Sequence, residues 1–120
     1  MFDVRQTMTD STYPDLASID VLTVLQALSD PVRLDIVRQL DSCADPGELM
    51  CGQIALAVTK STGSHHLKTL SRAGITAERE AGTCKYISLR RAELDRRFPG
   101  LLDSVLRAAN AEQPVARSVL

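Results

Sequence analysis

Aromatic residues are scarce in this chain of 120 residues, which has no tryptophan, two tyrosines and two phenylalanines. Flat cofactors and unpaired bases are commonly held by stacking against aromatic rings, so the sequence offers little for haem, flavin or single-stranded RNA. It also lacks GxGxxG and Walker-type GxxxxGK[ST] sequences, the usual signatures of dinucleotide and nucleotide-phosphate sites. We therefore expect no cofactor.

Cysteine is limited to Cys43, Cys51 and Cys84, an odd number and too few for the disulfide framework of a secreted protein. No apolar run approaches the roughly 18 residues of a membrane span, and the N-terminus lacks a basic-then-apolar signal. We expect a cytoplasmic protein that does not engage membranes. The two histidines are adjacent and the acidic residues are scattered rather than grouped in a pocket motif, so we expect no enzyme.

The length is that of one ordinary domain. Residues 1–14 show no periodicity and are rich in Thr, Asp and Ser, which predicts a flexible tail. Residues 15–111 are predicted to form the domain, and residues 112–120 a second flexible tail.

The charge is unevenly distributed along the chain. The formal net charge is −1, but residues 1–30 carry −4, residues 31–59 carry −2, residues 60–91 carry +5 and the remainder is neutral. A cationic middle third within an acidic chain is an electrostatic footprint of nucleic-acid binding, or else a solvated basic face.

Apolar spacing predicts five helices and a β-hairpin. Asp30 before Pro31 favours a helix start, Thr59 is a good N-cap, and Gly74 is a good C-terminal cap. Gly82-Thr83 separates two runs of period two, which predicts the hairpin. The predicted helices begin at Ser18, at Pro31, after Gly52 (with Ile54, Ala55 and Val58 inward), after Thr59 and at Phe98-Pro99, the last with an apolar stripe from Leu101 to Ala109.

This order is typical of a winged helix-turn-helix fold, mainly α with a two-stranded wing. A helix fits the major groove of B-DNA, where residues near its N-terminus reach base edges, while phosphate contacts supply most of the affinity. The predicted DNA-binding residues are Lys60, Ser61, Thr62, Ser64 and His65 near that N-terminus, with Lys68, Arg72, Arg79 and Lys85 on phosphates. His66 and Arg33 are predicted to be structural.

Three segments resemble the ArsR/SmtB family of dimeric bacterial transcriptional repressors. Residues 28–37 read LSDPVRLDIV, residues 60–74 read KSTGSHHLKTLSRAG, and residues 80–89 read EAGTCKYISL, similar to the family's opening, recognition segment and wing. The resemblance covers about residues 18–107. It implies a homodimer joined by the first and last helices, an operator with an inverted repeat, and release of DNA by an inducer, often a metal or an oxidant.

The chain departs from the family's pattern at three places. Gly63 replaces an apolar residue of the recognition helix, and Met50 replaces a Ser or Thr cap. The metal ligands do not carry over, because Cys51 stands alone where arsenic-sensing members have two cysteines and residues 99–111 contain no histidine. We therefore predict no metal site, and the inducer is unidentified.

Cys43 and Cys51 leave two readings open, ordinary half-buried thiols or a redox switch, since a thiolate beside basic residues is reactive. For the whole chain the alternative to a DNA-binding repressor is a winged-helix module that binds a protein without binding specific DNA.

Overall fold

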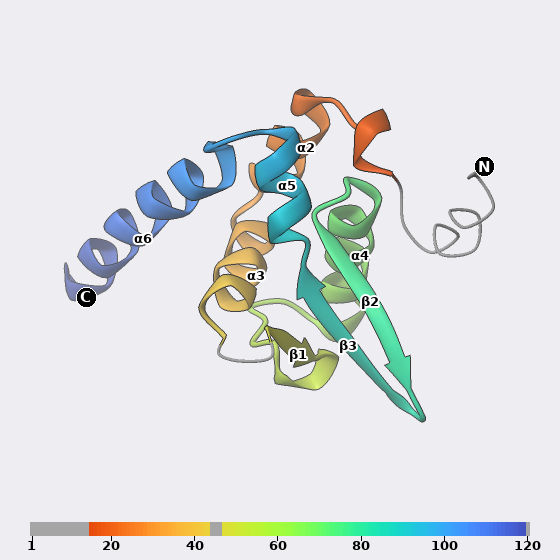
Figure 1. Ribbon diagram of the computed structural model, residues 1–120. Coiled ribbons are helices and arrows are strands. Elements are labelled where there is room, and N and C mark those ends of the chain that lie inside the picture. The colour runs from red at the N-terminus through yellow and green to blue at the C-terminus, as the bar shows by residue number, and fades with distance from the viewer. Residues whose placement is uncertain (1–14, 44–46, 120) are drawn as a thin grey trace.

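The computed structural model describes the backbone of residues 15–43 and 47–119, and the side chains of residues 15–43 and 47–112. The predicted N-terminal tail (1–14) lies outside the described residues, as do residues 44–46. The described part contains five α-helices and a three-stranded antiparallel sheet, in the order η2, α2, α3, β1, η3, α4, β2, β3, α5, α6 (Figure 1). The predicted fold class is confirmed, with one strand more than the predicted wing.

Helix α2 (Val21–Leu28) begins later than Ser18, after the single 3-10 turn η2 (Leu16–Ser18). Asp20 sets this start, because its carboxylate accepts hydrogen bonds from the backbone N–H and the hydroxyl of Thr23. The predicted apolar stripe is divided between two faces. Val24, Ala27 and Leu28 are buried, whereas Val21, Leu22 and Leu25 are 41, 64 and 40% exposed.

Helix α3 (Pro31–Ser42) has the predicted start. The Asp30 carboxylate accepts the backbone N–H groups of Val32 and Arg33 at 2.8 and 3.1 Å, and Pro31 occupies the first turn, where an N–H is not needed. Ile36, Val37 and Leu40 face the core.

The predicted third helix is wrong. In its place lie a short strand, β1 (Glu48–Met50), and one 3-10 turn, η3 (Cys51–Gln53). Ile54 is buried as predicted, but Ala55 is exposed. The backbone N–H of Met50 donates to Gln53 Oε1 at 2.8 Å, which closes this single turn.

Helix α4 (Lys60–Arg72) confirms the predicted fourth helix. The hydroxyl of Thr59 accepts the N–H of Thr62, and Gly74 closes the helix with φ of 81°. Only glycine adopts this backbone conformation without a steric penalty, and a Cβ at this position would approach Leu16 Cδ2 to 2.6 Å.

Strands β2 (Thr76–Ala81) and β3 (Cys84–Leu89) form the predicted hairpin, with Ala81 paired to Cys84 across the turn. Strand β1 pairs with the other edge of β3, giving the order β1-β3-β2. The pairing of Leu49 with Ile87 tethers the segment that leads into α4 to the wing.

Two helices close the chain where one is predicted. Helix α5 (Arg91–Arg97) has one buried residue, Leu94, and so leaves no periodic apolar pattern in the sequence. Helix α6 (Leu101–Val119) starts after the predicted Phe98-Pro99 and runs on through most of the predicted C-terminal tail.

One aliphatic core joins these elements. Each α-helix contributes to it, Ile87 is added from β3, and Ile75 is added from the bend just before β2. In Figure 1, α6 extends away from the helical body, while the β2–β3 hairpin passes α4 and its tip projects from the body in a different direction.

Candidate nucleic-acid interface

The polar face of α4 is open to solvent. Gly63, Leu67 and Leu70 face the core, so the predicted phase of the helix is correct. All nine residues predicted to bind DNA are exposed: Lys60, Ser61, Thr62, Ser64, His65, Lys68, Arg72, Arg79 and Lys85. The Ser61/His65 side of the helix is therefore available to a partner.

A groove of about 450 Å³ separates α4 from the wing. Lys68 and Arg72 line it from α4, and Lys85 lines it from β3. Glu78 is the one carboxylate among the lining residues, and it lies 3.6 Å from the Lys85 ammonium. The groove therefore carries net positive charge, which suits an anionic group such as a phosphate.

A second hollow, of about 400 Å³, lies at the start of α4 and is lined by Lys60, Ser61, Ser64 and the more apolar Leu56 and Leu67 among others. Its geometry explains Gly63. A Cβ at Gly63 would come within 2.4 Å of Leu56 Cδ1, so the glycine lets the chain before α4 pack directly on the helix. The apolar residue usual in the resembling family would occupy the space that Leu56 fills here.

Arg79 does not join the other predicted contacts. Arg79 pairs directly with Tyr86 across the hairpin. Lys85 is adjacent to Tyr86 in β3, so its side chain points to the opposite face of the sheet. The Arg79 guanidinium lies 4.5 Å from the centre of the Tyr86 ring. Its Nε and Nη2 donate to the Glu48 carboxylate at 3.0 and 2.8 Å.

Arg33 and His66 connect α4 to the helices behind it. Arg33 Nε donates to the backbone carbonyl of Ala27 at 2.7 Å, and its Nη1 lies 3.2 Å from His66 Nδ1. Both residues are therefore structural, as the sequence predicts, and they fix the orientation of α4 relative to α2.

The three cysteines are free thiols and are half-buried. The Cys43 thiol donates to the backbone carbonyl of Leu40 at 3.1 Å. Cys51 lines both the groove and the second hollow, so it lies beside α4. Cys84 lies on β3, next to the hairpin turn.

Two further properties concern the described residues alone. Among residues 15–43 and 47–112 there is no group of three His, Cys, Asp or Glu side chains placed to hold a metal ion. None of the helices in the described part is long and apolar enough to cross a membrane.

Sequence reasoning missed Glu48, Tyr86 and Leu56. Glu48 and Leu56 lie on either side of η3, in a segment without periodicity, and their importance depends on contacts with residues far along the chain. The aromatic residue in β3 was the one available signal, since a Tyr beside basic residues is suited to a cation–π contact.

Comparison with known proteins agrees with this arrangement. Residues 28–79 match a family model described as a helix-turn-helix domain. Over 84 residues the chain is 39% identical to the uncharacterized HTH-type transcriptional regulator YceK of Bacillus subtilis (strain 168), covering 68% of this chain and 82% of YceK.

A solved structure, that of a possible transcriptional regulator for arsenical resistance, is similar with a TM-score of 0.56 and 28% sequence identity, covering 77% of this chain and 97% of that one. The fold, the exposed face of α4 and the identity to YceK lead to one conclusion: the chain belongs to the helix-turn-helix family of DNA-binding transcriptional regulators.

Proposed function

We propose that the chain is a sequence-specific regulator of the ArsR/SmtB type, a homodimeric repressor that binds an inverted repeat in double-stranded DNA. The observation that carries this proposal is the exposed face of α4, where Lys60, Lys68 and Arg72 make no ion pair with any described residue. Unpaired cations on a helix that is polar along its outer side are suited to a phosphate-lined major groove.

The contacts divide by type. Lys60, Ser61, Thr62, Ser64 and His65 are assigned to base edges and nearby phosphates at the start of α4, because residues near the N-terminus of a recognition helix reach the bases. Lys68, Arg72 and Lys85 are assigned to phosphates, since they line one groove between α4 and the wing. Arg79 is set apart from them because Glu48 already holds its guanidinium.

A homodimer is supported by the exposed apolar side of α2. Val21, Leu22 and Leu25 are the large hydrophobic residues that the described monomer leaves exposed. The start of α6 packs against the buried side of α2, because Leu28 of α2 and Leu101 of α6 line the same small apolar cavity. Pairing of these surfaces would bring two α4 helices to half-sites about one helical turn, roughly 34 Å, apart.

Release of DNA is assigned to an inducer or to thiol oxidation. Cys51 supports release by thiol oxidation, because this residue lines both hollows beside α4. Oxygen atoms added to its sulfur would disturb the helix. Peroxide should lower the operator affinity of the wild type but not that of Cys51→Ser, with Cys43→Ser as the comparison. Equal loss in wild type and both variants would exclude these thiols.

The experiment that tests the proposal is selection of duplex DNA from a random pool, followed by fluorescence anisotropy with the selected and a scrambled duplex. Lys68→Ala should weaken binding to both and flatten the dependence of log K on log salt by about 0.9. Ser61→Ala or His65→Ala should reduce the preference for the selected duplex by about 1–3 kcal/mol. Equal binding to both duplexes by the wild type would contradict sequence-specific recognition, and a protein-binding module would be the alternative.

A further inference from the structure

Arg79 is held by two partners, the Tyr86 ring and the Glu48 carboxylate, whereas the cations of α4 make no ion pair with a described residue. Its side chain lies across the outer face of the sheet, from β2 over Tyr86 of β3 to Glu48 of β1. Two parallel hydrogen bonds, of 3.0 and 2.8 Å, join it to both oxygens of the Glu48 carboxylate. Glu48 is the more enclosed partner, with 19% of its side chain exposed against 55% for Arg79.

A carboxylate bound in this manner offers the same pair of anionic oxygens that a DNA phosphate offers to an arginine. We propose, on the basis of the proposed function, that Glu48 masks Arg79 from DNA. Arg79 then makes no contact with the DNA backbone, and the phosphate contacts come from α4 and Lys85. Glu48 is thus an internal competitor that sets the overall affinity for DNA.

The charge states favour the mask at neutral pH. The hydrogen bonds from Arg79 hold the pKa of Glu48 below its usual value, and the same bonds raise the pKa of Arg79. Both groups therefore stay ionised, and their charges cancel on the surface of the wing. A protein cation contributes to the salt dependence of binding only if it neutralises a phosphate and so releases condensed counterions from the DNA. An Arg79 that is already neutralised by Glu48 therefore contributes little.

The test compares salt slopes of duplex binding for the full chain and three variants. Glu48→Gln keeps the size of the side chain but removes its charge, which frees Arg79, and the slope should steepen by about 0.9. Between 50 and 200 mM salt that slope corresponds to an additional loss of affinity of about 3.5-fold. The double variant Glu48→Gln/Arg79→Ala removes the pair as a whole and should return the slope to that of the wild type.

Glu80→Gln is the matched control. Glu80 lies on the same strand as Arg79 and is exposed. It stands opposite Lys85 across the hairpin, but Lys85 forms its ion pair with Glu78, so the loss of Glu80 changes the net charge equally without breaking an ion pair. Its slope should stay close to the wild-type value. Thermal unfolding of each variant checks that the fold is kept.

Two results would overturn the mask. The first is an equal salt slope of DNA binding for Glu48→Gln and Glu80→Gln. The second is a salt slope of the double variant that is about 0.9 flatter than that of the wild type, because this would show that Arg79 already contacts DNA in the wild type. If Glu48→Gln unfolds, the comparison of salt slopes between the double variant and the wild type alone decides whether Glu48 masks Arg79. A wild type that binds no duplex at all contradicts the proposed function itself, and is distinguished in this way from failure of the mask.

Discussion

Single residues with strong local chemistry determine where the helices of this molecule begin. Asp30 is the clearest, since its carboxylate accepts two backbone N–H groups at the start of α3. Burial alone would raise the pKa of Asp30, but the hydrogen bonds from Arg33 and Val32 outweigh it and lower the pKa below its usual 3.8. The ionised form is therefore the one that stabilises the fold.

Replacement of Asp30 should reveal this dependence. Asp30→Ala is expected to reduce the free energy of unfolding by about 0.5–2 kcal/mol at neutral pH. Because the pKa is lower in the folded state, the contribution of Asp30 is complete above pH 3.8 and is lost as the pH falls through the folded-state pKa.

Asp30→Asn is the control, because an asparagine caps the helix without titrating. Urea unfolding between pH 7 and pH 3 should show a smaller acid-induced loss for Asp30→Asn than for the wild type. Parallel curves for the two proteins would show that the Asp30 charge is unimportant.

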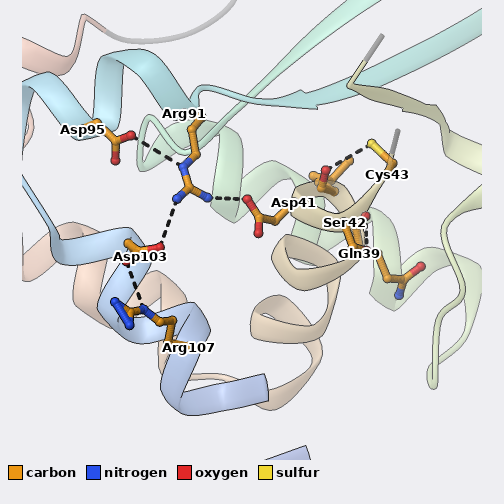
Figure 2. A network of polar contacts seen from close by, with 9 residues as sticks. Gln39, Asp41, Ser42, Cys43, Arg91, Asp95, Asp103 and Arg107 are labelled. Carbon is orange, nitrogen blue, oxygen red and sulfur yellow. Dashed lines mark hydrogen bonds and ion pairs between the residues drawn. The ribbon is translucent and has the colours of Figure 1, made fainter. Parts of the chain in front are cut away.

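Whole elements depend on contacts between distant parts of the chain, as the position of α6 illustrates. Arg91 at the start of α5 lies among three carboxylates, those of Asp41 from α3, Asp95 from α5 and Asp103 from α6 (Figure 2). Arg107 extends this network from within α6, 3.2 Å from Asp103. The long terminal helix is thereby tied to the two helices beside it.

Loss of the central cation should loosen that attachment. Arg91→Ala leaves three carboxylates without their shared partner and is expected to increase amide hydrogen exchange at the start of α6, with less effect on the buried α3. The stability change should be about 1 kcal/mol and should shrink in high salt, because exposed ion pairs are weak and screened.

Arg107→Ala serves as the comparison, since Arg107 is 74% exposed and its partner Asp103 lies within its own helix. Its exchange pattern should remain near that of the wild type. If both variants loosened α6 equally, the network would not be the attachment we describe.

The elements that could be predicted from the sequence are those that carry their own signals. Asp30-Pro31 and the pair Thr59 and Gly74 mark the bounds of α3 and α4, so the exposed face of α4 could also be predicted. Strand β1 could not, because three residues contain no pattern and their pairing with β3 is what makes them a strand. For the same reason Glu48 and its bond to Arg79 lay beyond sequence reasoning.

At the scale of the whole molecule the open question is how two chains would meet. The exposed Val21, Leu22 and Leu25 form an apolar surface on α2, and covering the exposed part of each side chain is worth roughly 0.6–2 kcal/mol. A second copy of the chain is the partner that the proposed function requires.

Charge placed on this surface should prevent pairing. Leu22→Lys/Leu25→Lys is expected to raise the dimer Kd at least roughly 100-fold, because each subunit would bury lysine in place of leucine. Thr83→Lys adds charge at the exposed hairpin turn, outside α2 and α6, and should leave the dimer intact. Sedimentation equilibrium measures both; a wild type that is monomeric at micromolar concentrations would contradict the dimer.

The proposed function depends on α4 presenting its outer face to duplex DNA. The most direct measurement is a titration of isotope-labelled protein with the selected duplex, followed by backbone amide chemical shifts. We predict the largest changes at Lys60–Lys68 and beside the groove at Lys85, with little change on β2 near Arg79. Shifts confined to α2 and α6, with the α4 amides unmoved, would contradict it.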